Sequence, residues 1–304
     1  MVMIKRVLAL LGSGALAILL LRQAETAAQA VRDGVQLCLT SVIPALFPFF
    51  AVSSLLVALG AAEAAGRALA PPFRRLFRCG GAGCAALLLG LVGGYPVGAR
   101  TAAELVRRGE LSPAEGARLL TFCNNAGPAF AIGVAGVSVF GSARTGVWLY
   151  LLHCAAALLT GLLFCRRPLP VTAMPKRPVP PQTGLTGQFL RAVEGAVSAM
   201  ARVCGFVVFF LVLLRLTEGL IGPLPPLAAG VLELTNGILR LTPDRRGFVT
   251  AAALLGWGGL SVHCQTAAVT AGSGISLRLY LPAKAVQAAL SAGLAALLAP
   301  YLLP

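Results

Sequence analysis

The chain has 304 residues, of which 58% are hydrophobic and 12% are charged, and its mean hydropathy is +0.85. This composition excludes an ordinary soluble domain and indicates an integral membrane protein. The net charge of +15 does not indicate a nucleic-acid partner, because the basic residues lie singly or in small groups between apolar stretches, as in the cytoplasmic loops of membrane proteins. We therefore expect a multi-pass protein of the cell membrane, whose first partner is the lipid bilayer and which binds no nucleic acid.

The amino-terminal segment, residues 1–30, allows two interpretations. It carries Lys5 and Arg6, then an apolar run over residues 7–21, and ends on the small-residue triplet Ala28-Gln29-Ala30. This order fits a secretory signal peptide with a cleavage site, and it also fits a short first transmembrane helix. We favour the transmembrane helix because many apolar segments follow it. Both interpretations place residue 30 outside the cell.

The next segment, residues 36–60, is long and apolar enough to span the bilayer, and Pro44 and Pro48 should kink it. Four arginines then fall between residues 60 and 79, which marks a cytoplasmic loop. A further charged stretch over residues 100–118 predicts a second cytoplasmic connection.

Between these charged stretches, residues 80–99 are apolar and rich in glycine. Gly90, Gly94 and Gly98 recur every four residues, a spacing that lets helix backbones approach closely. Pro96 should break the helix, because proline cannot donate a backbone hydrogen bond. The segment therefore either spans the membrane or re-enters it.

A helix should begin at Ser112-Pro113-Ala114-Glu115, which is a capping box with proline at the first helical position. It cannot continue through Gly127-Pro128, and the eleven residues up to Cys123 reach roughly 16 Å, too short for a bilayer core of about 30 Å. Asn124 and Asn125, two of only three asparagines in the chain, follow in this break. A polar break in apolar sequence is tolerated only where protein or a watery cavity receives the freed backbone groups. We predict a binding site here.

Residues 145–165 form a clean predicted span, and the proline-rich, basic stretch after it is expected to be a cytoplasmic linker. The predicted organisation is an N-terminal helix or signal-like segment (1–30), a first membrane repeat (31–165), the linker (166–188) and a second membrane repeat (189–304).

The second half repeats the pattern of the first. Residues 43–50 align with residues 203–210, and residues 93–103 align with residues 258–268 at six identical positions of eleven. Paired repeats broken at matching places are typical of transporters, in which the site lies where the breaks meet. The predicted fold is an all-α polytopic membrane protein, built as an inverted repeat of helices with broken or re-entrant segments.

The inversion follows from the charges. If the arginine loop and the linker are both cytoplasmic, segment 36–60 runs inward and segment 203–221 runs outward. Arg240, Arg245 and Arg246 then lie outside, which counts against the inversion.

The second repeat has its own polar interruption at Glu233, Thr235 and Asn236. The apolar run around it is about thirteen residues, or roughly 20 Å as a helix, which is again too short to span the bilayer. An acidic residue in such a place is costly and suggests a function. The alternative is an interfacial helix with Glu233 in headgroup water.

His263 and Gln265 occupy the repeat positions of Gly98 and Arg100, where each is either a ligand for the solute or an interior hydrogen-bonding residue. The predicted substrate-binding residues are Asn124, Asn125, Glu233, Thr235, Asn236, His263 and Gln265. The residues expected to form the structural breaks are Gly94, Pro96, Gly98, Gly127 and Pro128.

No catalytic residues are predicted, because the chain lacks a nucleophile elbow, a phosphate-binding loop, a zinc-protease motif and a dinucleotide fingerprint. The eight cysteines include no C-x-x-C pair and only two histidines are present, so we expect neither a metal site nor another cofactor. The protein is accordingly not expected to be an enzyme.

Three stretches in order, residues 94–100, 109–112 and 118–128, closely resemble the YlbJ-type sporulation integral membrane family, part of the wider nucleoside-recognition (Gate) domain group. Residues 232–238 and 258–263 resemble motifs of its second half. The resemblance implies a multi-spanning membrane protein linked to spore cortex formation, with a fold related to the gate region of nucleoside transporters. It does not imply a particular substrate.

The predicted function is transport, or channel-like passage, of a small polar, nucleoside-like solute in a sporulating cell. The rival hypothesis is a non-transporting membrane scaffold for cortex assembly, and homo-oligomerisation is left open. If Asn125 lines a cavity at a break, replacing it with alanine should leave the fold largely intact, because little packing volume is lost.

Overall fold

The computed structural model describes residues 2–59, 61–166 and 184–303, and this part of the chain contains helices and connecting loops but no strand. Most of the predicted linker therefore lies outside the described residues. The helices in chain order, with the two π-helical segments written η, are α1 (Val2–Arg22), α2 (Ala24–Leu37), η1 (Cys38–Val42), α3 (Ile43–Ala58), α4 (Ala61–Phe77), α5 (Gly83–Gly93), α6 (Val97–Arg107), α7 (Pro113–Leu120), η2 (Ala129–Val139), α8 (Ala143–Phe164), α9 (Leu185–Ile221), α10 (Pro226–Leu232), α11 (Leu234–Leu239), α12 (Arg245–Trp257), α13 (Gly259–Thr270) and α14 (Tyr280–Leu302).

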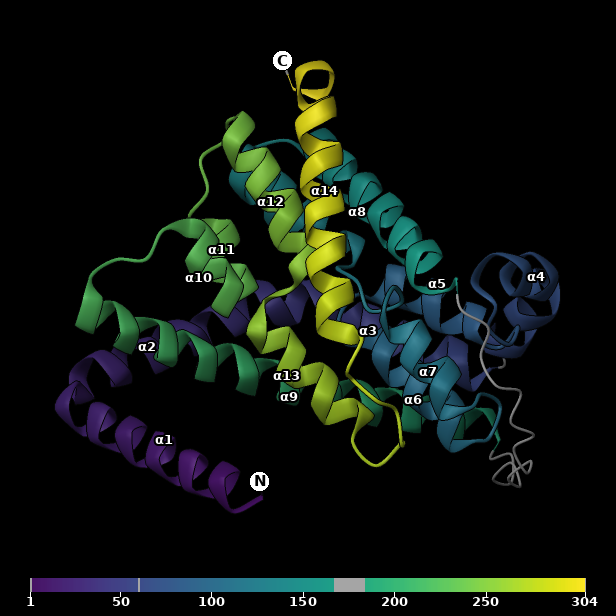
Figure 1. Ribbon diagram of the computed structural model, residues 1–304, viewed down its shortest axis with the longest axis horizontal. Helices are drawn as coiled ribbons and strands as arrows, with labels where there is room; N and C mark the ends of the chain where they lie inside the picture. Colours follow the sequence, from purple (N-terminus) through teal and green to yellow (C-terminus); the bar gives the residue numbers. More distant parts are fainter. Residues whose placement is uncertain (1, 60, 167–183, 304) are drawn as a thin grey trace.

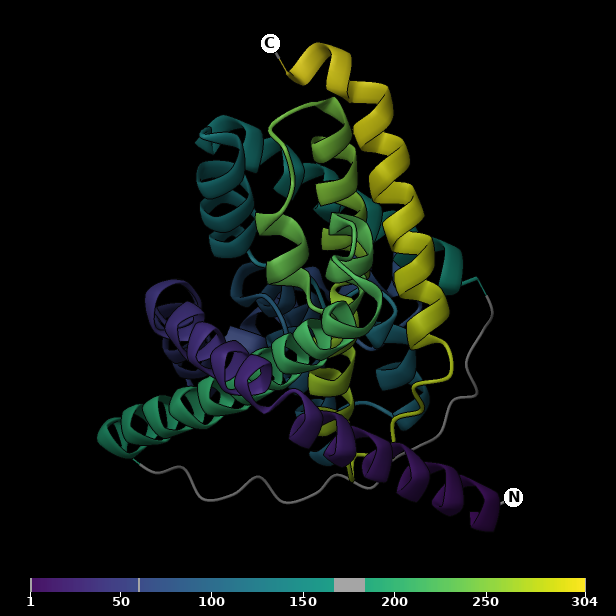
Figure 2. The same ribbon diagram turned by 90° about the vertical axis from the view of Figure 1, so that its left-hand side faces the viewer.

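Long helices form two packed groups. In one group, α14 packs against α12 and α8, and η2 packs against α8. In the other group, α9 packs against α2 and α3, and these helices run across the first group (Figures 1 and 2). Short helices connect the two groups: α10 contacts both α9 and α12, α13 contacts α9 and α10, and α11 contacts η2 and α12.

The membrane character of the chain is confirmed by its described residues, in which four helical stretches are long and apolar enough to cross a bilayer: Ala143–Phe164, Leu185–Ile221, Arg245–Thr270 and Tyr280–Leu302. A fifth span is formed if the two helices over residues 24–42 and 46–56 are counted as one, and these are bent by 59°. The bend lies where Pro44 and Pro48 predicted a kink. The chain is thus an all-α, multi-pass membrane protein.

The prediction that residues 60–79 form a loop is wrong, because residues 61–77 form the helix α4. Phe73 and Phe77 are four residues apart and share one helix face, which is buried against Phe122. The ring centroids of Phe77 and Phe122 are 4.6 Å apart and stacked. Arginines and apolar residues at helical spacing therefore produce an amphipathic helix here. Likewise, the charged stretch 100–118 is largely helical in α6 and α7.

Predicted breaks are present in both halves, but Gly98, which was also expected to form a break, lies inside α6. Helix α5 ends at Gly94, which has a φ of +75°, and α6 begins after Pro96. In the aligned segment of the second half, α12 ends at Gly258, which has a φ of +92°. These positive φ angles are strained for residues with a side chain, which explains the glycines. The inverted relation of the two halves stays a prediction.

The predicted capping box is confirmed at the start of α7. The backbone N–H of Glu115 donates to Ser112 Oγ at 3.2 Å, and the Ser112 N–H donates to Glu115 Oε2 at 2.9 Å. The helix ends at Leu120, three residues earlier than expected, and residues 121–127 are not helical. This non-helical stretch, hereafter the buried break, is enclosed on all sides, since residues 119–127 are all buried.

Close glycine contacts hold α5 and α6 against the buried break. A Cβ atom placed on Gly90 or Gly98 would lie 1.8 or 1.9 Å from the carbonyl oxygen of Cys123. Backbone therefore packs directly on backbone here, as the four-residue glycine spacing predicted.

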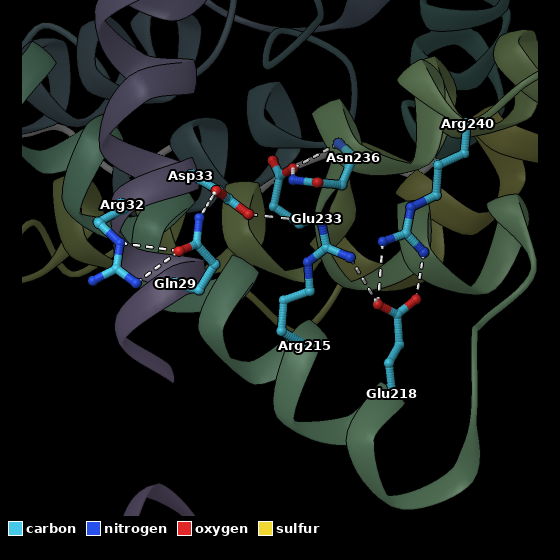
Figure 3. Close-up of polar contacts among 8 residues, drawn as sticks. All are labelled: Gln29, Arg32, Asp33, Arg215, Glu218, Glu233, Asn236 and Arg240. Carbon is cyan, nitrogen blue, oxygen red and sulfur yellow. Dashed lines mark hydrogen bonds and ion pairs between the residues drawn. The ribbon is translucent and has the colours of Figure 1, made fainter. Parts of the chain in front are cut away.

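A chain of charged residues ties α9 to the end of α11 at the edge of the molecule (Figure 3). The guanidinium of Arg240 donates to Glu218 Oε2 at 3.3 Å and makes a second, shorter contact with Oε1. Arg215 approaches the same carboxylate at 3.6 Å. The Glu218 side chain is only 12% exposed, so this carboxylate is a structural tie rather than a solvated surface charge.

We predict that Gly98→Ala lowers the free energy of unfolding by about 3 kcal/mol or more, because the new methyl group collides with a backbone oxygen that cannot rotate away. Gly293→Ala is the matched control: Gly293 lies in α14 with nothing within 4 Å of its Cβ position, so alanine there should be neutral or stabilise by up to about 1 kcal/mol. Thermal melts of the purified variants in detergent measure both. Equal melting temperatures for the two variants would contradict the packing described here.

Candidate functional site

A cavity, hereafter the central cavity, lies where the breaks of the two halves meet. The cavity and its opening together hold about 630 Å³ of empty space. Gly94, Tyr95 and Gly127 line it from the first half, and Glu233 and Thr235 line it from the second. The expectation that the two breaks lie near each other is therefore confirmed. The rest of the lining is Ser41, Val42, Leu46, Phe130, Val134, Val203, Val207, Leu234, Ser261, Val262 and Gln265.

Glu233 is placed by the break between α10 and α11. Its backbone is extended, with φ −137° and ψ 114°, and its side chain caps α11. Glu233 Oε2 accepts from the backbone N–H and from the side-chain amide of Asn236, each at 2.8 Å (Figure 3). The glutamate is 2% exposed, so it does not sit in headgroup water. Asn236 therefore holds the carboxylate and is not itself among the residues that line the cavity.

Most of the remaining polar lining of the central cavity comes from the second half, and Ser41 adds a hydroxyl from the first half. Thr235 lies in the first turn of α11, and Ser261 and Gln265 lie one turn apart on α13. Gln265 Nε2 donates to Ser261 Oγ at 3.3 Å. Predicted residues Glu233, Thr235 and Gln265 are thus brought together, on a wall that is otherwise apolar.

The two predicted asparagines of the first half do not line this cavity. Both are fully buried. Asn124 Nδ2 donates to Thr266 Oγ1 at 2.8 Å and to the Tyr280 hydroxyl at 3.2 Å. Asn125 Nδ2 donates to the carbonyl of Phe122 at 2.7 Å. The Asn124 side chain thus bonds the buried break to α13 and α14. The Asn125 side chain supplies the partner that a freed backbone carbonyl needs in the protein interior.

His263 belongs to the same buried network. Its Nδ1 lies 3.2 Å from the Tyr280 hydroxyl, and its ring stands edge-on to Trp257 with 4.5 Å between ring centroids. Of the two alternatives for His263, the structure shows the interior hydrogen bond.

Lys284 is a member of the network that the sequence analysis did not identify. It is fully buried in α14, where Nζ donates to the Asn124 carbonyl at 3.0 Å and to Gln287 Oε1 at 2.7 Å. Gln287 Nε2 in turn donates to Asn125 Oδ1 at 2.9 Å. No carboxylate in the described part of the chain forms an ion pair with this ammonium group. The missed signal was a single charged residue in an apolar helix, with Gln287 three residues along on the same face.

Tyr95 joins the central cavity to this network. Its ring lines the cavity, and Lys284 Nζ lies 5.4 Å from the ring centroid. Its hydroxyl donates to the Leu255 carbonyl at 2.7 Å, which fixes the ring between α5 and α12. An aromatic ring attracts a cation through its face, so Tyr95 stabilises the buried ammonium group and at the same time separates it from the cavity.

Four buried polar atoms around the network have no hydrogen-bond partner among the described residues: Asn124 Oδ1, His153 Nδ1, His263 Nε2 and Ser291 Oγ. His153 Nε2 accepts from the backbone N–H of Ala126 at 3.0 Å, so the neutral ring carries its proton on the unpartnered Nδ1. Buried polar groups are normally satisfied. The network therefore has room for water-mediated hydrogen bonds that the side chains alone do not make.

Two known groups of proteins are similar to this chain in sequence. Residues 39–143 match the family described as nucleoside recognition (Gate), a range that holds the first break, Asn124 and Asn125 but not Glu233 or His263. The chain is also 27% identical over 309 residues to the sporulation integral membrane protein YlbJ of Bacillus subtilis (strain 168), covering 85% of this chain and 74% of that protein. No solved structure matches. The resemblance drawn from the motifs is confirmed.

The burial of Asn125 reverses the expectation that its loss is harmless to the fold. Asn125→Ala leaves the Phe122 carbonyl and the Gln287 amide without their partners, which costs about 2–4 kcal/mol of stability at about 1–2 kcal/mol for each buried group. Asn236→Ala is the comparison, because a backbone N–H still binds Glu233 there, so the loss should stay near about 1 kcal/mol. Thermal melts of the two variants in detergent measure these losses of stability, and the melting temperature of Asn125→Ala should fall further than that of Asn236→Ala. A wild-type melting temperature for Asn125→Ala would contradict the network.

Proposed function

We propose that this multi-pass membrane protein, with its Gate-type region, passes a small polar, nucleoside-like solute across the membrane through the central cavity. One observation carries the proposal: two helix breaks from the two halves of the chain share one cavity, and polar side chains are grouped on its second-half wall. Transporter sites are commonly built from broken helices that meet at the interface of two repeats. The match to the nucleoside-recognition family supports the class of solute.

The lining suits such a solute. Glu233 has one carboxylate oxygen engaged by Asn236, and a carboxylate accepts strong hydrogen bonds from hydroxyl groups such as those of a ribose. Thr235, Ser261 and Gln265 offer both donors and acceptors for ring nitrogens and carbonyls. Tyr95 and the aliphatic residues provide an apolar surface for the face of a base. The proposal includes no chemical step on the solute.

Movement would occur at the breaks. Helices α10 and α11 are joined only through extended Glu233, and α12 and α13 only through Gly258, so each pair has a natural hinge. A rocking motion of α10, α11 and α13 against the two groups of long helices would open the cavity alternately to either side. The capped carboxylate of Glu233 lies at one such hinge, where binding of solute and movement of α11 are mechanically linked.

Similarity to YlbJ leads us to propose that this passage serves a sporulating cell and supports formation of the spore cortex. A membrane scaffold for cortex assembly remains the competing function. A scaffold needs the outer surface of the folded protein, whereas a transporter needs the cavity wall, so the two functions are separated by variants that change only that wall.

We predict that Thr235→Val and Gln265→Leu each weaken solute binding at least tenfold, because a site built for hydrogen bonds loses about 1–3 kcal/mol with each lost partner. Binding is measured as the shift in melting temperature of the purified protein over a panel of nucleosides. Thr250→Val is the control, since this threonine bonds only to a carbonyl of its own helix, α12.

In a spore-forming host that lacks its own copy, the two cavity variants should reach wild-type abundance in the membrane and fail to restore cortex formation. Full restoration by both would favour the scaffold over the transporter.

A further inference from the structure

A second cavity lies beside the first and differs from it in chemistry. It holds about 790 Å³ of empty space including its open side. Three arginines line it, namely Arg100 and Arg107 from α6 and Arg202 from α9, with Glu104 as the one acidic residue. The remaining lining residues are Pro96, Ala199, Val203, Phe206, Gln265, Ala268 and Val269. We call this space the arginine vestibule.

The vestibule is adjacent to the central cavity, because both are lined by Val203 and Gln265. Gln265 therefore presents its side chain at the boundary between a polar, positively charged space and the cavity that contains Glu233. A ligand that filled the vestibule would contact a residue of the proposed transport site.

The lining of the vestibule carries three arginines and one carboxylate. The carboxylate of Glu104 is shared between Arg107, at 3.8 Å, and Arg108, at 2.9 Å. Arg100 Nη1 donates to the carbonyl of Gly195 at 3.2 Å, and Arg202 donates to Ser198, so the hydrogen-bond partners of both guanidinium groups among the described residues are neutral. Arg100 is repelled by the like charges of Arg202 and Arg107 and attracted by Glu104. An anion between the guanidinium groups of Arg100 and Arg202 would relieve their repulsion.

The side chain of Arg100 packs against a glycine of the neighbouring helix α9. A Cβ atom on Gly195 would lie 2.9 Å from Arg100 Nη2, so the absence of a side chain lets the guanidinium lie against α9. Arg202 comes from the same helix, just before its apolar run begins at residue 203. Two guanidinium groups from different helices are thus held around one open space, at the edge of the apolar part of α9.

We propose that the arginine vestibule binds a phosphate group. Guanidinium groups match phosphate oxygens with paired, charge-assisted hydrogen bonds, and three arginines against one carboxylate favour an anion over a cation or a neutral solute. The phosphate belongs either to a soluble phosphorylated compound or to the headgroup of an anionic lipid, since basic pockets between membrane helices also bind headgroups. This site is additional to the central cavity and does not depend on the proposed transport.

The test uses the full-length protein purified in a neutral detergent, at constant ionic strength with chloride as the reference anion. The probes are inorganic phosphate, adenosine 5′-monophosphate, adenosine, and vesicles of phosphatidylglycerol or phosphatidylcholine. Binding is read as a rise in melting temperature, and the phosphorus NMR line width of the soluble phosphates gives a second readout. We expect each phosphate-bearing probe to stabilise the protein more than its phosphate-free or neutral counterpart does, so any effect of adenosine in the central cavity is subtracted.

Variants assign the effect to the vestibule. In Arg100→Gln/Arg202→Gln, the concentration of phosphate probe that gives half of the effect should rise at least tenfold. Arg245→Gln/Arg246→Gln removes the same charge from two exposed arginines at the start of α12 and should leave the effect unchanged. Gly195→Leu keeps every charge but displaces the Arg100 guanidinium, so it should weaken binding even if the double variant fails to fold.

Stabilisation by soluble phosphates assigns a soluble ligand, and stabilisation by phosphatidylglycerol alone assigns a lipid headgroup. The proposal is overturned if no phosphate-bearing probe acts, if Gly195→Leu and the double variant both bind as the wild type does, or if the exposed-arginine control loses binding to the same extent. None of these outcomes depends on nucleoside binding in the central cavity.

Discussion

The structure depends on one constraint: seven residues of non-helical backbone, 121–127, lie in an apolar interior where water cannot satisfy them. Each freed group must find a partner in the protein. Lys284 donates to the carbonyl of Asn124, His153 accepts from the N–H of Ala126, and the Asn125 amide turns back to the carbonyl of Phe122. Because these partners come from α8 and α14 as well as from the break itself, satisfying the backbone also fixes the packing of the long helices around it.

The buried lysine shows how far this constraint extends. Taking an ammonium group out of water costs several kcal/mol, and here the compensation comes from a carbonyl, a glutamine and the face of Tyr95 rather than from a carboxylate. A fully packed apolar side chain would cost less. Lys284 lies next to Tyr95, which also lines the central cavity. This position fits a residue with a functional role rather than a stabilising one, since functional sites often contradict what stability alone would choose.

Local sequence predicted the breaks well and the direction of their side chains poorly. The capping box at Ser112, the glycine at position 94 and the interruption at Glu233 follow from backbone rules that act over a few residues. Whether Asn124 faces a cavity or the core depends on helices 150 residues further along the chain, and no local pattern contains that information. Lys284 was missed for a related reason: the Asn124 carbonyl to which it donates is remote in sequence. Helix α4 was mistaken for a loop because its arginines were counted as charges and the spacing of Phe73 and Phe77 was not used.

The arginine vestibule also bears on the relation between the two halves. The alignment of residues 93–103 with residues 258–268 pairs Arg100 with Gln265, and the structure places both of these side chains on the vestibule wall. Positions related by a two-fold axis can meet only close to that axis, because the distance between equivalents grows with their distance from it. A pair of aligned residues on one cavity wall is therefore what an inverted repeat would produce near its axis, and an accidental match between unrelated segments would not be expected to bring them together. The two members of the pair have diverged in charge. In the proposed arrangement, the first-half member of the pair binds phosphate and the second-half member, Gln265, forms the boundary with the central cavity.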